Sequence, residues 1–151
     1  MSGKLRITVN EAKYLKLIYR QQYEKLCKVK TTLLARSVGV RPATVTEMLQ
    51  RLAEKGLVKY TRYHGVKLTE KGVNEARKLL RKHRLLEVLF VRFLDYNVQK
   101  ACVEASKLDY YASENLVNTI CRTYGHPKNC PCNKAVFCDE RCRGEAKEER
   151  T

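Results

Sequence analysis

The residues best suited to chemistry are cysteines near the C-terminal end, where five of the chain's seven fall between Cys121 and Cys142. Residues 126–143 are too few and too polar to bury a core, so a metal or a cross-link must hold them together. A zinc ion with four thiolate ligands would do this. We expect the ligands to be four cysteines with the spacing C-x-C-x5-C-x3-C: Cys130, Cys132, Cys138 and Cys142.

Other chemistries stay open for this segment. The spacing differs from the C-x2-C pairs that are usual at zinc sites, and an iron–sulfur cluster or disulfide bonds would also restrain the chain. An iron–sulfur cluster would make the protein a redox or iron sensor. Divalent iron and manganese are the cofactors that we expect least. We expect Cys121, within a predicted helix, to be the spare thiol and Cys27 to be no ligand.

Charge is distributed unevenly along the chain. Residues 1–84 contain 21 Lys and Arg against 6 Asp and Glu, whereas residues 85–151 contain 10 of each kind, so the net charge of +15 lies in the first part. A polyanion is the natural partner of such a surface, because each neutralised phosphate releases counterions. We expect this partner to be double-stranded DNA. An RNA- or ribosome-associated zinc protein, or a basic surface kept only for solubility, are the alternatives.

The basic part has the element order of a winged helix-turn-helix. Helices are predicted over residues 10–24, 31–39 and 42–56, and short strands over residues 57–60 and 66–68. Gly39 suits the left-handed end of the second helix, and Pro42 suits the first turn of the third. This arrangement presents the third helix to a DNA major groove.

The third helix has polar residues away from its apolar side that suit DNA reading. Their hydroxyl, amide, guanidinium and carboxylate groups can bond base edges or phosphates. The turn between the strands adds groups suited to the backbone or the minor groove. The expected DNA-binding residues are Arg41, Ala43, Thr44, Thr46, Glu47, Gln50 and Arg51 in the helix, and Arg62, Tyr63, His64 and Lys67 in the wing.

The neutral second part is predicted to be helical, over residues 69–95, 98–112 and 113–124. An inward stripe on the first of these helices consists of Ala76, Leu80, His83, Glu87, Phe90 and Leu94. The fold class is therefore mainly α. We expect four parts: a DNA-binding domain over residues 1–72, a helical domain over 73–125, a cysteine-rich metal-binding segment over 126–143, and a disordered tail over 144–151.

Several classes of protein are excluded by composition. No apolar run reaches the roughly 20 residues that a membrane-spanning helix needs, and no signal-peptide pattern is found. We therefore expect a cytoplasmic protein without a membrane partner. The three histidines lie far apart, and the chain has neither a phosphate-cradling glycine loop nor a recognisable Ser–His–Asp set. We expect no enzyme and no small-molecule substrate.

Residues 8–127 resemble the DtxR/MntR family of metal-dependent transcriptional repressors. The most specific segments are residues 45–49, 55–58, 63–72 and 81–87. The resemblance implies a homodimer formed through the helices after the wing, so that residues 73–125 become a dimerisation domain. It also implies binding to a palindromic operator, whose two half-sites match the two-fold axis of the dimer.

The resemblance further implies a regulatory metal site, with ligands on the first helix, the long helix and the helix after it. His83 and Glu87 keep ligand positions of the family, and Cys102 and Asp109 stand at others. We expect these four residues to form a reduced site, at which a thiolate would favour zinc over manganese. A family ligand position in the first helix is occupied by Lys13, whose ammonium group repels divalent cations.

Two other interpretations of this site stay open. Lys13 could replace the metal by pairing with Glu87 or Asp109, which would lock the repressor in its DNA-binding form. Alternatively, His83 and Glu87 could form only a structural hydrogen bond, since polar residues on an apolar stripe are usually satisfied in this way.

Overall fold

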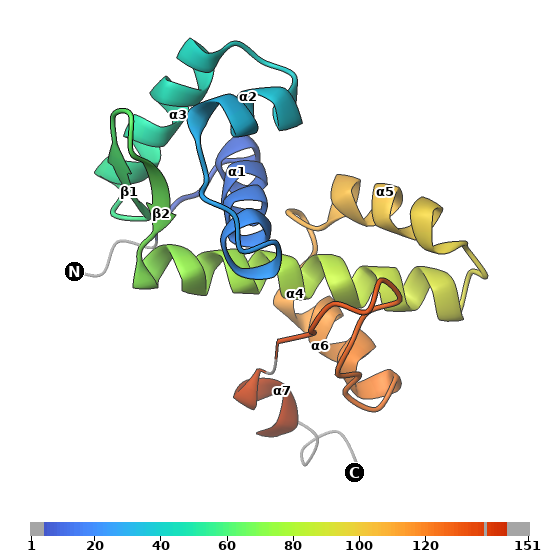
Figure 1. Ribbon diagram of the computed structural model, residues 1–151. Coiled ribbons are helices and arrows are strands. Elements are labelled where there is room, and N and C mark those ends of the chain that lie inside the picture. The colour runs from blue at the N-terminus through green and yellow to red at the C-terminus, as the bar shows by residue number, and fades with distance from the viewer. Residues whose placement is uncertain (1–4, 138, 145–151) are drawn as a thin grey trace. The chain divides into compact units, whose positions relative to one another are not determined.

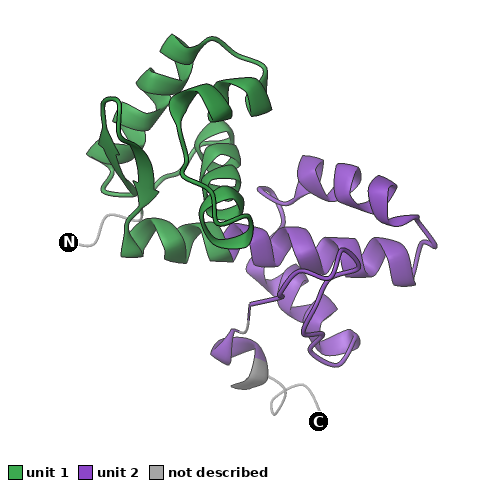
Figure 2. Ribbon diagram, viewed as in Figure 1, with its two compact units in different colours: residues 1–77 green, residues 78–151 purple. Residues whose placement is uncertain are grey.

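The computed structural model describes residues 5–137 and 139–144. Figure 1 labels the helices and strands, and Figure 2 colours the two compact units of the chain, residues 1–77 and residues 78–151. Helices dominate both units, and the sheet of the described residues is a two-stranded hairpin in the first. The prediction of a mainly α fold that begins with a winged helix-turn-helix is confirmed. The expected tail falls outside the described residues from residue 145 onward.

The first unit begins with α1 (Val9–Tyr19), which continues into a π-helical turn, η1 (Arg20–Glu24). The helix starts slightly earlier than residues 10–24 predicted, because Thr8 and Glu11 form a capping box. Glu11 N donates to Thr8 Oγ1 at 3.2 Å, and Thr8 N donates to Glu11 Oε2 at 2.9 Å. Both backbone N–H groups at the helix start are thereby satisfied.

Helices α2 (Thr31–Val38) and α3 (Pro42–Glu54) form the helix-turn-helix. Gly39 caps α2 with a φ of +76°, in the left-handed region that suits glycine. The predicted apolar side of α3 is buried, at Val45, Met48, Leu49 and Leu52. The opposite side of α3 is therefore left to solvent.

The wing consists of β1 (Val58–Thr61) and β2 (Gly65–Leu68), which pair antiparallel with Thr61 opposite Gly65. The turn comes close to the segment before α2, where Val66 N donates to Val29 O at 3.0 Å. A Cβ atom at Gly65 would lie 2.6 Å from that carbonyl oxygen, so only glycine fits there. This contact holds the turn end of the wing next to the segment that leads into α2.

The second unit is built on α4 (Glu70–Arg92), which starts in the first unit, with α5 (Val98–Leu108), α6 (Glu114–Thr123) and the short α7 (Glu140–Gly144). Its core includes Leu86 and Phe90 of α4, Ala105 of α5 and Val117 of α6. Leu94, predicted to continue the inward stripe, is 45% exposed because α4 ends at Arg92. No helix of the described residues is both long and apolar enough to cross a membrane.

Two buried arginines of α4 hold the loop between α6 and α7. Arg81 Nε donates to Phe137 O at 3.0 Å, and Arg84 Nη1 donates to Ala135 O at 2.7 Å. The loop turns back on itself through a bridge between Asn129 and Ala135. Because a buried guanidinium needs hydrogen-bond acceptors, these carbonyl groups fix the path of the cysteine-rich loop along α4.

Candidate functional site

Helix α3 presents its polar side to solvent. Six of its seven expected DNA-binding residues are exposed: Arg41, Ala43, Thr44, Glu47, Gln50 and Arg51. The seventh, Thr46, is half-buried, and its Oγ1 donates a hydrogen bond to Pro42 O at 3.1 Å. Apart from the methyl group of Ala43, the exposed groups are guanidinium, amide, hydroxyl and carboxylate groups, which can bond base edges and phosphates in a major groove.

The wing adds further polar side chains near α3. The four expected residues are all exposed: Arg62, Tyr63, His64 and Lys67. Tyr63 is 87% exposed, and the guanidinium of Arg62 lies 5.3 Å from the centre of its ring. A hollow of about 270 Å³ near the wing is lined in part by Lys30, Thr46 and Arg62. Cationic and hydroxyl groups around a hollow suit the phosphates of a nucleic-acid backbone.

A buried polar cluster forms in the second unit around His83 and Glu87, which lie one turn apart on α4. Their side chains are 1% and 2% exposed, and His83 Nε2 lies 2.9 Å from Glu87 Oε1. Asp109 is the C-cap residue of α5, and its Oδ2 lies 3.0 Å from His83 Nδ1. Cys102 places Sγ 3.6 Å from His83 Nε2. The structure thus brings together the four residues that the sequence assigned to a regulatory site.

The loop between α6 and α7, residues 124–139, is called the C-terminal loop below. It adds thiols to this cluster, and the sequence did not predict them at this position. Cys132 is exposed as a residue, but its Sγ donates a hydrogen bond to Glu87 Oε2 at 3.2 Å. The ligand atoms of Glu87, Cys130 and Cys132 lie within 4.8 Å of one another. Desolvation of the Cys132 thiol, its hydrogen bond to Glu87 and the charge of that carboxylate raise its pKa to about 12. A nearby cation would reverse this effect.

The expected site with all four cysteines differs from the arrangement of the described residues. Cys130 and Cys132 lie beside Glu87, whereas Cys142 belongs to a different cluster. Cys138 lies outside the described residues. The physical reason is the turn of the loop, which the α4 arginines anchor and which carries the first two cysteines towards α4. Spacing along the chain does not reveal such a turn.

Cys121, expected to be a spare thiol, belongs to that second cluster together with His126 and Cys142. A signal for this was present in the sequence, because Gly125 ends α6 directly before His126 and returns the chain over the last turn of the helix. Cys27, expected to be no ligand, is exposed in the first unit, where its Sγ donates to Lys25 O at 3.3 Å.

The groups around Glu87 suit a borderline metal such as zinc better than manganese. His83, Glu87, Cys102 and Cys132 offer an imidazole nitrogen, a carboxylate and two thiols. Thiolates select soft or borderline metals, whereas manganese prefers oxygen ligands. The bond of Asp109 to His83 Nδ1 leaves Nε2 facing the other groups, as in sites where a carboxylate orients a ligating histidine.

Two protein families match consecutive parts of the chain. Residues 7–66 match the family described as iron dependent repressor, N-terminal DNA binding domain. Residues 69–137 match the family described as iron dependent repressor, metal binding and dimerisation domain. The second match includes the whole cluster around Glu87.

Curated relatives point to the same class. An uncharacterised helix-turn-helix transcriptional regulator of Methanocaldococcus jannaschii is 37% identical over 107 residues, which are 71% of this chain and 86% of that protein. The transcriptional regulator MntR of Bacillus subtilis is 30% identical over 87 residues, which are 58% of this chain and 61% of MntR. The chain therefore spans most of the archaeal relative but about three fifths of the bacterial one.

Solved structures agree with these matches. A manganese-dependent transcriptional repressor in complex with manganese has a TM-score of 0.80 and 33% identity, and the match covers 86% of this chain and 59% of that one. A hypothetical protein from Sulfolobus solfataricus has a TM-score of 0.69 and 28% identity, and the match covers 87% of this chain and 100% of that one.

Proposed function

Because the chain belongs to the iron-dependent repressor family of transcriptional regulators, the DtxR/MntR family, we propose that it is a homodimeric DNA-binding repressor controlled by a metal ion. The observation that carries the proposal is the buried pair of His83 and Glu87 on α4, to which α5 and the C-terminal loop both bring thiols. A purely structural hydrogen bond would not need ligand groups from three separate segments. The protein would act in the cytoplasm, together with the DNA.

DNA binding would use α3 in the major groove and the wing on the backbone. The exposed polar side of α3 offers Gln50 for adenine and Arg41 or Arg51 for guanine or phosphate. Arg62 and Lys67 of the wing would neutralise phosphates and make the affinity depend on salt.

A dimer would bury apolar side chains that the second unit exposes. Large apolar groups on the surface often mark an interface. The residues concerned are Phe93, Leu94, Val103, Leu108, Tyr111 and Leu116. A two-fold dimer would place two copies of α3 on the two half-sites of a palindrome.

Zinc is the metal that we propose for the cluster, with His83, Glu87, Cys102 and Cys132 as ligands. The ion would supply the positive charge that lets the two thiols ionise beside a buried carboxylate. Asp109 would orient the imidazole rather than bind the ion, because it contacts the ring nitrogen away from Glu87. Bound in this way, the ion would join α4, α5 and the C-terminal loop.

Selection from random duplexes tests this function. Purified full-length protein loaded with zinc is expected to enrich sequences with two inverted half-sites, and sedimentation should give a dimer. Tighter binding to RNA hairpins than to any selected duplex would contradict the DNA proposal. A brown protein with visible iron–sulfur absorption would contradict zinc as the cofactor.

A further inference from the structure

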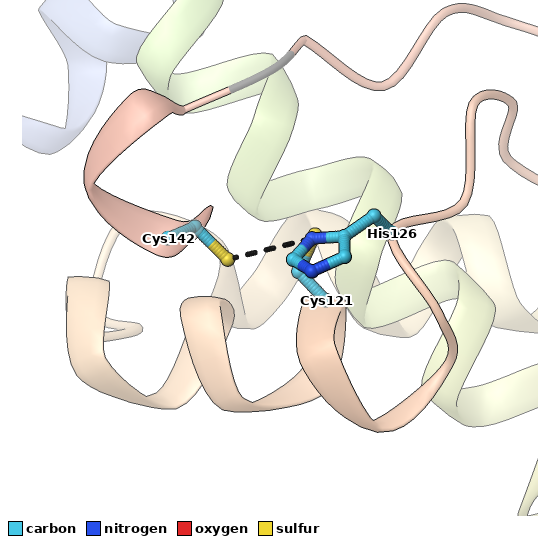
Figure 3. Close-up of side chains that lie close together, drawn as sticks. All are labelled: Cys121, His126 and Cys142. Carbon is cyan, nitrogen blue, oxygen red and sulfur yellow. Dashed lines mark hydrogen bonds between the residues drawn. The ribbon is translucent and has the colours of Figure 1, made fainter. Parts of the chain in front are cut away.

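A second group of metal-ligating side chains lies at the end of α6, apart from the cluster around Glu87. Figure 3 shows Cys121 of α6, His126 of the following loop and Cys142 of α7 pointing towards one another. Cys121 Sγ lies 3.3 Å and Cys142 Sγ 3.8 Å from Nδ1 of His126. Both thiols are buried, and the three ligand atoms lie within 4.8 Å of one another.

The two sulfur atoms face the same ring nitrogen. An imidazole nitrogen carries either one hydrogen or one lone pair, so it forms one good hydrogen bond and not two. A hydrogen bond from Cys142 Sγ to Asn118 O, at 3.6 Å, accounts for one of the thiols, whereas a shared cation accounts for both sulfur atoms at this nitrogen. With a Zn–S bond of about 2.3 Å and a Zn–N bond of about 2.0–2.1 Å, a tetrahedral site places sulfur and nitrogen about 3.5 Å apart. The two observed separations lie on either side of that value.

The chain is bent to place His126 over Cys121. Helix α6 ends in a Schellman motif, in which His126 N donates to Cys121 O at 2.8 Å and Gly125 N donates to Arg122 O at 3.1 Å. Gly125 has a φ of +70° and His126 a φ of +54°. A left-handed histidine costs conformational energy, and such residues gather at functional sites.

A buried guanidinium nitrogen of Arg81 provides a second observation beside these three side chains. Its Nη2 is buried and has no hydrogen-bond acceptor within the part of the chain that the structure describes. Arg81 lies next to Cys121, but burial and the neighbouring Cys142 raise the pKa of Cys121 by more than Arg81 lowers it. A metal ion bound at Cys121 would keep its sulfur ionised, and that sulfur would then give Nη2 of Arg81 an acceptor.

We propose that Cys121, His126 and Cys142 bind a zinc-type ion that is separate from the ion proposed at Glu87. It would fasten α7 to the end of α6. The fourth ligand position would be taken by Asp139 or by water, since Asp139 lines the same cavity of about 110 Å³ as the three ligands. The site does not depend on DNA binding, so it stands or falls separately from the proposed function.

Metal content of the full-length protein tests the proposal. After zinc loading and removal of weakly bound ions, wild-type protein should hold one zinc ion more per chain than Cys142→Ser. His126→Gln, which keeps both thiols, should lose the same ion. Cys27→Ser is the matched control, because that exposed thiol lies in the other unit, and it should retain the wild-type content.

Cobalt gives the site a signature of its own. Wild-type protein loaded with Co²⁺ should show sulfur-to-cobalt charge transfer and the visible bands of a tetrahedral ion. Both should weaken in Cys142→Ser and in His126→Gln, and Cys27→Ser should match the wild type. If a variant loses helicity by circular dichroism, the wild-type protein is titrated with a chelator instead. This titration should release an ion in a step separate from the release of the ion at Glu87. Equal metal content and spectra in wild type and His126→Gln, or a Cys121–Cys142 disulfide by mass spectrometry, would overturn the proposal.

Discussion

The two units use their charges in opposite ways. In the first unit the charged groups of α3 and the wing are exposed, as at Arg41, Arg51 and Arg62. In the second unit charged groups are buried, among them Arg84 and Glu87. The small net charge of the second unit, 14 Lys and Arg against 10 Asp and Glu over residues 78–151, therefore gives no sign of these buried charges. A net charge along the sequence indicates where a polyanion binds, but it does not reveal charges that are paired inside the protein.

Buried charge in the second unit is matched to the C-terminal loop. A guanidinium without acceptors would be costly to bury, and Nε of Arg81 and Nη1 of Arg84 each donate to a backbone carbonyl of that loop. The loop in return brings Cys132 to Glu87. Helix and loop thus depend on each other, which makes this part of the molecule suitable for control by a metal ion.

Loss of the central carboxylate should have the largest effect. Glu87→Gln removes a negative ligand from the buried cluster, so zinc affinity at this cluster should fall by more than about 100-fold, beyond the range for an orienting residue. Competition with a coloured chelator measures the affinity, and circular dichroism checks that the variant folds. Unchanged affinity would mean that the cluster is only structural.

Asp109→Asn should have a smaller effect at the same cluster, because Asp109 contacts Nδ1 of His83 and not the proposed metal side of the ring. Loss of an orienting partner typically lowers metal affinity by about 10–100-fold. The number of ions bound should stay the same. If Asp109→Asn removed an ion altogether, Asp109 would be a ligand, as the sequence first suggested.

A substitution on α3 should change the base preference, whereas a substitution on the wing should change the affinity for all duplexes alike. Gln50→Ala should cost about 1–3 kcal/mol on the selected duplex and relax the preference at one base pair. Arg62→Ala should weaken all duplexes evenly and lower the slope of log affinity against log salt by about 1. Anisotropy titrations at several salt concentrations measure both. Lys107→Ala, an exposed change on α5, serves as the control.

The smallest expected effect concerns the start of α1. Thr8→Ala removes the capping hydroxyl and should lower the free energy of unfolding by about 1 kcal/mol. Chemical denaturation of the full-length protein measures this value. Thr8→Ser keeps the hydroxyl and should retain most of the stability, and equal losses in both variants would speak against the cap.

The same capping box should make the first unit sensitive to acid. Burial raises the pKa of Glu11, but the hydrogen bond and charge of Lys55 and the bonds from Thr8 outweigh burial, so the net pKa lies below its usual 4.5. The stability that Glu11 contributes is therefore present above pH 4.5 and lost as the pH falls through the lower folded value. Denaturation of Glu11→Gln should show a weaker dependence on pH in this range.

The helix-turn-helix could be predicted almost completely because its signals are local. Gly39, Pro42 and the apolar side of α3 lie within a few residues of one another, and α3's face follows from helical spacing alone. Helix α1 starts at Val9, one residue before the predicted start, because Thr8 and Glu11 form a capping box. Leu94 was predicted to lie in the core because the helical spacing of the inward stripe continues past the residue at which α4 ends.

The metal clusters were harder to predict because their members meet only after tertiary folding. His83 and Glu87 follow from helical spacing, but Cys132 reaches them through a loop path that buried arginines fix. Cysteine spacing therefore suggested one site of four thiols. No feature of the sequence next to Cys142 distinguishes it from the other cysteines. Its neighbours in the cluster come from α6 and from the turn after that helix.

Operator affinity with and without metal tests the central claim most directly. Anisotropy with a selected palindromic duplex should show wild-type protein binding about 5–150-fold more tightly when zinc is bound at Glu87 than after chelation, the usual range for coupled sites. Glu87→Gln should show no such difference. Equal affinity of zinc-loaded and chelated wild-type protein, with zinc shown to occupy the cluster, would contradict the account.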